Sequence, residues 1–151
     1  MASVAPPTPD QVAKYVADVL SCEAPPDVVA AYLFGSCLDG DMRTDSDIDV
    51  GIVAGRDVWT RAGWVPWHLE AEVGRVLRGF AGHEFHVTVL SPRQVRFSFR
   101  VVAKGRRLWT CNGDAADDFV MYVARMYPDE LYRYQQAEPV LIEELRQHGR
   151  S

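Results

Sequence analysis

The segment FGSCLDGDMRTDSDIDVGI, residues 34–52, places two aspartates where a buried strand would normally carry apolar side chains. In a strand, alternate side chains point to the same face, so Asp47 and Asp49 project together while Ile48 and Val50 face the core. The alternation therefore predicts a strand over residues 47–53 with two carboxylates on one side. Carboxylates held side by side repel each other, so this arrangement is favoured where a cation compensates their charge.

A Gly-Ser pair, Gly35-Ser36, lies ten residues ahead of the first aspartate. It follows VVAAYLF, residues 28–34, a continuous apolar run that predicts a central buried strand. A turn after such a strand opens a helix N-terminus, where free backbone N–H groups favour an anion. Gly35 lets a phosphate approach the backbone, and the Ser36 hydroxyl can donate a further hydrogen bond. Since Mg²⁺ binds one or two carboxylates together with phosphate oxygens, the segment combines a phosphate cradle with a metal-binding pair.

The remaining helices and strands are predicted from hydrophobic periodicity and from the prolines and glycines that mark their ends. Asp10 is the expected N-cap of a first helix, and Ser91 that of a later one. Pro128 is expected to interrupt the last helix. Helices are predicted over residues 9–22, 59–80, 91–104 and 114–147, and the second of these is expected to start irregularly. Further strands are predicted over residues 83–90 and 106–110. This order predicts an α+β (α/β-like) fold with a small mixed sheet flanked by helices.

Length and composition bound the function classes. The chain has 151 residues, which suits one domain, with a core over about 10–110 and a C-terminal helical segment over about 114–148. A net charge of −5 argues against a domain that grips nucleic acid. No apolar run reaches membrane-spanning length, and the N-terminus lacks a signal-peptide pattern. Three cysteines without a C-x-x-C pair suit a reducing compartment, so a cytoplasmic protein is expected.

The spacing of Gly35-Ser36, ten residues and Asp47-Ile48-Asp49 resembles the G-S-x10-D-x-D signature of the DNA polymerase β-like nucleotidyltransferase superfamily. The similarity is to its minimal nucleotidyltransferase (MNT) domains and spans roughly residues 10–135. Two further elements fit the family pattern. They are Gly40 with Asp45-Ser46 ahead of the aspartates, and the run Lys104 to Trp109, which resembles a G-x-x-L-aromatic element.

This resemblance implies a metal-dependent nucleotidyltransferase with ATP as substrate and Mg²⁺ (or Mn²⁺) as cofactor. Asp47 and Asp49 would be the catalytic, metal-holding carboxylates, with Asp49 bridging two ions. Gly35, Ser36 and Ser46 would bind the nucleotide. On the residues alone, the aspartates could instead belong to a solvated loop or a charged edge strand.

Two departures from the family pattern bear on activity. A basic residue usually precedes the second glycine, whereas this chain has Asp39. The third strand normally supplies a third metal-binding carboxylate, and here that position falls on His86. Glu84, two residues earlier on the same face, is the alternative ligand. Neutral imidazole is a poorer Mg²⁺ ligand than carboxylate but serves Mn²⁺ or Zn²⁺.

Small members of this kind resemble the antitoxin of HEPN–MNT toxin–antitoxin pairs. The resemblance therefore implies transfer of AMP from ATP to a hydroxyl of a HEPN-type ribonuclease toxin. One alternative is an antitoxin of the same fold that neutralises its partner by binding, and another is transfer to a small aminoglycoside-like molecule. The C-terminal segment, with Tyr122, Met126, Tyr132 and Tyr134, is the surface expected to meet a partner or a second copy.

Overall fold

The computed structural model describes residues 5–148, so the two ends of the expected domain, residues 1–4 and 149–151, lie outside the described part. A five-stranded sheet has the order β3-β4-β2-β1-β5. β1 is antiparallel to β2 and β5, β2 is parallel to β4, and β3 is antiparallel to β4. The strands are β1 (Val28–Phe34), β2 (Ile48–Ala54), β3 (Gly79–Phe80), β4 (His83–Val89) and β5 (Arg106–Thr110). The expected mixed sheet is confirmed.

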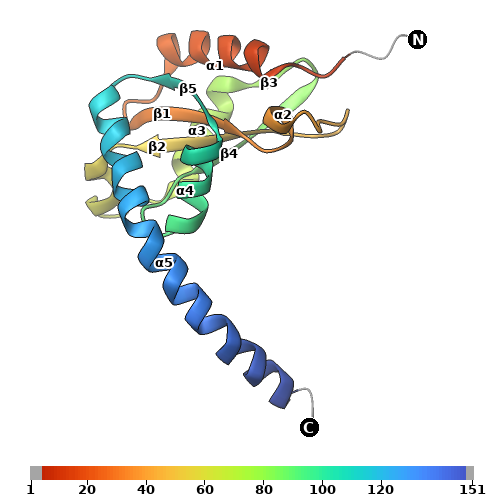
Figure 1. The fold of residues 1–151 in the computed structure, drawn as a ribbon. Helices are drawn as coiled ribbons and strands as arrows, with labels where there is room; N and C mark the ends of the chain where they lie inside the picture. The colour runs from red at the N-terminus through yellow and green to blue at the C-terminus, as the bar shows by residue number, and fades with distance from the viewer. Residues whose placement is uncertain (1–4, 149–151) are drawn as a thin grey trace.

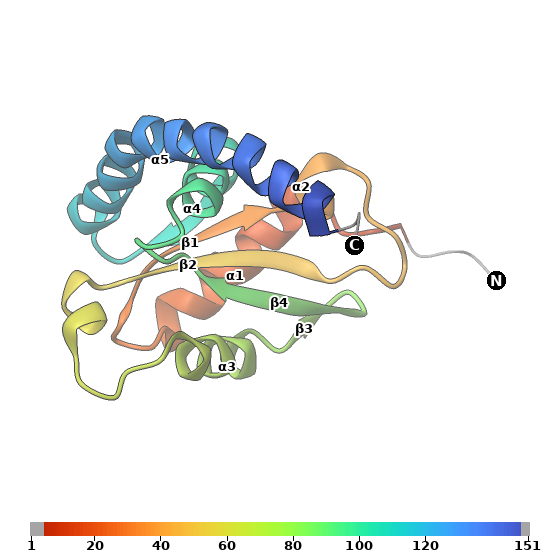
Figure 2. The same cartoon turned by 90° about the horizontal axis from the view of Figure 1, so that it is seen from below.

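Helices cover both faces of this sheet, as Figure 1 and Figure 2 show. α1 (Pro9–Glu23) and α3 (Pro66–Leu77) pack on one face, while α4 (Val95–Lys104) and α5 (Gly113–His148) pack on the other. The short α2 (Ser36–Asp39) and the 3-10 helix η1 (Arg56–Thr60) lie in the connections after β1 and β2. The C-terminal part of α5 extends away from the sheet (Figure 1).

The alternation in β2 decides which face the aspartates occupy. Ile48, Val50 and Ile52 are fully buried in the core shared with α1 and α3. Val53 belongs to the second core, with residues of α4 and α5. Since Asp49 alternates with the first set, its side chain points to the α4 and α5 side of the sheet.

Local expectations were wrong in four places. Thr8, not Asp10, caps α1: its hydroxyl accepts from the Gln11 N–H, and the Gln11 side chain accepts from the Thr8 N–H. This capping box satisfies two backbone donors, so it outcompetes a cap two residues later. α4 begins at Val95 rather than at Ser91, whose hydroxyl accepts from the Arg93 N–H within a turn.

The other two differences concern the ends and the continuity of helices. The predicted helix over residues 59–80 ends at Leu77, because Arg78 has a positive φ of 61°, and Gly79–Phe80 then pair with β4. α5 is continuous through Pro128 and Pro139. Both prolines are exposed, so the carbonyls that lose a helical N–H partner lie on the solvent side.

Candidate functional site

The turn after β1 requires glycine. Gly35 has φ 78° and ψ −156°, a backbone conformation that is essentially restricted to glycine. A Cβ at this position would collide with Oδ2 of Asp49 and lie 3.1 Å from its Cγ. The glycine of the Gly-Ser pair and the second aspartate, 14 positions apart in the sequence, are therefore packed directly against each other.

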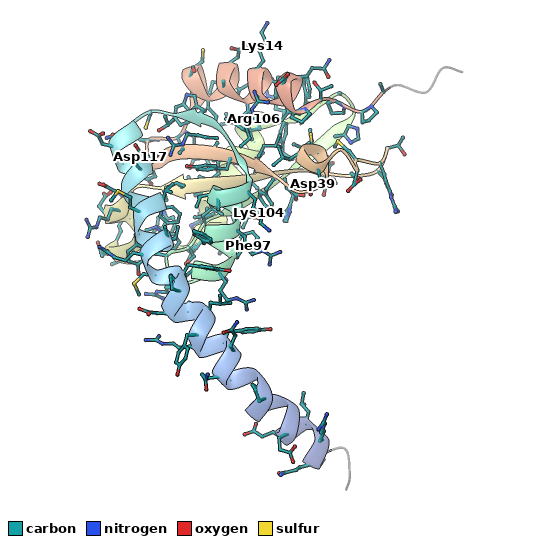
Figure 3. The ribbon with its side chains drawn as sticks, viewed as in Figure 1. Lys14, Asp39, Phe97, Lys104, Arg106 and Asp117 are labelled. Carbon is teal, nitrogen blue, oxygen red and sulfur yellow. The ribbon has the colours of Figure 1, made fainter. Side chains whose placement is uncertain are left out.

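Strand register explains this contact. Asp49 is the β2 partner of Phe34, the last residue of β1, and on its other side it is the partner of His86 in β4. Phe34 stacks edge-on against Phe97 of α4, with ring centroids 5.7 Å apart. α2 and α4 both contact β1, and Figure 3 shows Asp39 on α2 and Phe97 on α4. The site thus lies at one end of the sheet, between these two helices.

Asp49 is a partly shielded carboxylate that contacts the side chain of His86. Its side chain is 27% exposed, and its Oδ1 lies 3.1 Å from Nδ1 of His86, whose side chain is 64% exposed. Asp47 is exposed and precedes the first residue of β2. Asp49 therefore lies against the turn, whereas Asp47 is exposed to solvent immediately before β2 begins.

A short loop fixes the approach to the aspartates. The Arg43 N–H donates to Oγ of Ser46 (2.9 Å), and the Ser46 N–H donates to the Arg43 carbonyl (3.1 Å). Nδ1 of His83 lies 2.7 Å from the Ser46 carbonyl oxygen. No local sequence pattern links His83 to residue 46, so this contact could not be predicted from the sequence. The Ser46 hydroxyl accepts a loop hydrogen bond and keeps its own proton to donate.

Cys37, beside the turn, is buried under the site. Its Sγ lies 3.8 Å from the Pro7 carbonyl oxygen. Burial raises the pKa of the Cys37 thiol, and the negative charge of Asp49 raises it further. The thiol therefore stays protonated at neutral pH and is not an activated nucleophile.

The side chains fit a metal ion shared with a substrate better than a metal ion held by protein alone. No group of three or more His, Cys, Asp or Glu placed to hold a metal occurs within residues 5–148, so Asp47, Asp49 and His86 do not form one. Glu84 is exposed and pairs with β3 at the sheet edge. Mg²⁺ commonly binds one or two carboxylates and completes its shell with water and phosphate oxygens. Asp47 and Asp49 fit that role.

A cavity of about 470 Å³ lies at the opposite end of the sheet, where Val29 and Ala54 line it together with Trp59, Phe119 and Tyr122. None of the residues that line this cavity belongs to the predicted site. No helix within the described part of the chain is long and apolar enough to span a membrane.

Three solved structures have a similar fold, each under 25% identical. One is a toxin–antitoxin with AMP-PNP (TM-score 0.62, 22% identity, covering 86% of this chain and 98% of that chain). The second is a mutant of the toxin–antitoxin MntA-HpeT (0.61, 21%, 83% and 94%). The third is a tri-AMPylated Shewanella oneidensis HEPN toxin in complex with MNT antitoxin (0.57, 19%, 83% and 91%).

Comparison at the level of sequence gives the family. Among curated proteins, no sequence matches significantly. The family model described as "Polymerase beta, Nucleotidyltransferase" matches residues 18–114, which is more than half of the chain and contains the Gly-Ser turn, both aspartates and β4. The chain belongs to the polymerase beta nucleotidyltransferase family.

Proposed function

We propose that the protein transfers AMP from ATP to a hydroxyl group of a partner toxin and acts as the antitoxin of that toxin. The observation that carries this proposal is the packing of the Asp49 carboxylate against the Gly35 turn. A phosphate chain lying on the turn would be within reach of the carboxylate side of β2. A bound cation can therefore contact the phosphates and the protein at the same time.

Each side chain has a role in the proposed reaction. Gly35 leaves the backbone open to the triphosphate, and the Ser36 hydroxyl donates to a phosphate oxygen. Asp47 and Asp49 would hold Mg²⁺ or Mn²⁺. When bound, the ion neutralises phosphate charge and orients the acceptor for in-line attack. The acceptor oxygen forms a bond to the α-phosphorus, the bond to the β-phosphate breaks, pyrophosphate leaves, and the hydroxyl proton passes to solvent.

The partner is supported by fold similarity. One similar structure is a toxin–antitoxin with AMP-PNP, and another is a tri-AMPylated HEPN toxin in complex with an MNT antitoxin. Carried over to this chain, these findings favour adenylylation of a protein hydroxyl and a HEPN-type partner.

Label transfer tests this function. The purified protein is incubated with a HEPN toxin, Mg²⁺ or Mn²⁺, and ATP labelled at either the α- or the γ-phosphate. We expect label on the toxin from α-labelled ATP only, and none with the Asp47→Asn/Asp49→Asn variant. Label from γ-labelled ATP would indicate phosphoryl transfer, and no transfer under either metal would remove the enzymatic proposal.

A second candidate function is neutralisation by binding alone. It is favoured by His86 at the position opposite Asp49, where the family pattern has a carboxylate, and by the lack of a three-ligand group in residues 5–148. The same double variant separates the two functions in cells that express the toxin. If the double variant still protects those cells, binding to the toxin is sufficient for neutralisation. If protection is lost while the complex still forms, transfer of AMP is required.

A further inference from the structure

β4 holds the aspartate segment at two points. Where the two strands pair, His86 contacts Asp49. The ladder between β2 and β4 begins at Ile48, so Asp47 lies before the first paired residue. Within the described residues 5–148, the hydrogen bond from β4 to the segment ahead of the ladder is that of His83 to the Ser46 carbonyl. This bond reaches the peptide group that joins Ser46 to Asp47.

His83 is a buried residue whose side chain has a defined hydrogen-bond partner. It is 7% exposed at the start of β4, and its partner is a backbone carbonyl oxygen, which can only accept. Nδ1 must therefore carry the proton and donate. Because buried polar groups are costly when unpaired, the bond also holds the Ser46 carbonyl in one orientation. That orientation sets the direction in which the next residue, Asp47, leaves the loop.

We propose that His83 is a positioning residue for Asp47, through which it prepares the metal–nucleotide site. This inference rests on the proposed function, because it concerns the same site. It goes beyond that function because it assigns a role to the hydrogen bond by which His83 of β4 holds the loop 43–47. Apart from this hydrogen bond, the described part of the chain gives the loop two hydrogen bonds between Arg43 and Ser46, and both are local.

The reach of the side chain distinguishes positioning from general stability. If asparagine replaces His83, its side-chain amide nitrogen can lie where Nδ1 of the histidine lies and donate to Ser46. The longer glutamine side chain instead places its amide nitrogen where Nε2 of the histidine lies. His83→Asn should therefore restore the bond to Ser46, and His83→Gln should not. Both variants lose the imidazole ring and its packing, so a purely structural role predicts similar behaviour for the two.

The first readout is binding of Mn²⁺–ATP, measured by titration calorimetry. Loss of a residue that orients a metal ligand typically weakens metal affinity by about 10–100-fold. We expect that increase in Kd for His83→Gln and an increase within about 3-fold for His83→Asn. Tyr15→Phe is the matched control, because it removes a hydrogen bond from a side chain to the Leu77 carbonyl on the face of the sheet away from Asp49. Its Kd should equal that of the wild type.

The second readout is hydrogen exchange at the amides of residues 43–47 without any ligand. Exchange at the Ser46 amide should be faster in His83→Gln than in the wild type, and near wild type in His83→Asn. Equal affinity and equal exchange in His83→Gln and the wild type would overturn the positioning role and leave the proposed function intact. If the wild type binds no Mn²⁺–ATP, the proposed transfer falls, and the positioning role falls with it.

Discussion

At the scale of single residues, the site is built by groups that converge on one carboxylate. Gly35 lies against Asp49 from β1, His86 contacts it from β4, and the buried Cys37 thiol responds to its charge. The contacts with Gly35 and His86 reduce the freedom of the Asp49 side chain. A carboxylate held in this way can meet a cation without first losing rotamer entropy, which is the physical basis of preorganisation.

Gly35→Ala tests the contact between the turn and Asp49. The added methyl group would collide with the carboxylate in a backbone conformation that alanine rarely adopts, so Asp49 must move. We expect the Kd for Mn²⁺–ATP to rise by roughly 10–100-fold, together with a loss of stability measured by urea unfolding. Gly40→Ala is the control, because φ is +81° there and no heavy atom lies within 4 Å of the new Cβ.

For Gly40→Ala we expect a loss of about 1 kcal/mol from the left-handed backbone and unchanged affinity. Should the two alanine variants bind Mn²⁺–ATP equally well, the contact between Gly35 and Asp49 does not matter for binding.

At the scale of elements, α5 is a helix whose sides have different environments. Val123 is fully buried, Tyr127 stacks on Phe99 of α4 with centroids 4.2 Å apart, and Arg96 lies 3.7 Å over the Tyr134 ring. Other large side chains on the same helix are open to solvent, with Met121 69% and Tyr132 64% exposed. The packing on α4 explains why the helix continues through Pro128, since tertiary contacts override local preference.

Truncating one tyrosine at a time shows which contacts hold α5. Tyr127→Ala removes the ring that stacks on Phe99, so we expect the free energy of unfolding to fall by about 2 kcal/mol. Tyr132→Ala removes an exposed ring on the same helix and should change it by less than about 0.5 kcal/mol. Chemical denaturation followed by circular dichroism measures both. Similar losses in the two variants would contradict the packing of α5 on α4.

At the scale of the whole molecule, the sheet separates two regions. Gly35 and Asp49 lie at the end where β1 stops and β2 starts, whereas the 470 Å³ cavity lies at the end marked by Val29 and Ala54. The antiparallel register of β1 and β2 sets this separation, because it pairs Phe34 with Asp49 and Val28 with Ala54. A ligand at the aspartate end is held by segments that meet only when the sheet is folded, so its binding should stabilise the fold as a whole.

Thermal unfolding with and without ligand tests this coupling. A ligand that binds only the folded state stabilises it by about 2.7 kcal/mol at 100 times its Kd. We expect Mn²⁺ with ATP to raise Tm and EDTA to reverse the rise. Asp49→Asn should remove the shift without removing the cooperative transition. A shift of the same size in Asp49→Asn would place the ligand elsewhere on the molecule.

Local sequence patterns predict the two strands and the turn on which the site is built. The continuous apolar run of residues 28–34 predicts β1 with the bounds that it has, because proline and glycine delimit it. The alternation around Asp47 and Asp49 predicts a strand with both carboxylates on one side, and β2 begins one residue later than expected. The Gly-Ser pair predicts the turn at Gly35 that follows β1. These features depend on neighbours a few residues apart, so periodicity and turn chemistry reveal them.

Which distant residues meet depends on the folded arrangement of the strands and helices. The parallel pairing of β4 with β2 brings His86 to Asp49 and His83 to the Ser46 carbonyl, and no local pattern encodes either contact. Likewise, α5 remains helical at Pro128 because it packs on α4, whereas the sequence pattern predicts an interruption there. The physical reason is that strand order and helix packing depend on how the whole hydrophobic core is buried. Their energies therefore belong to the assembled molecule and not to any short segment.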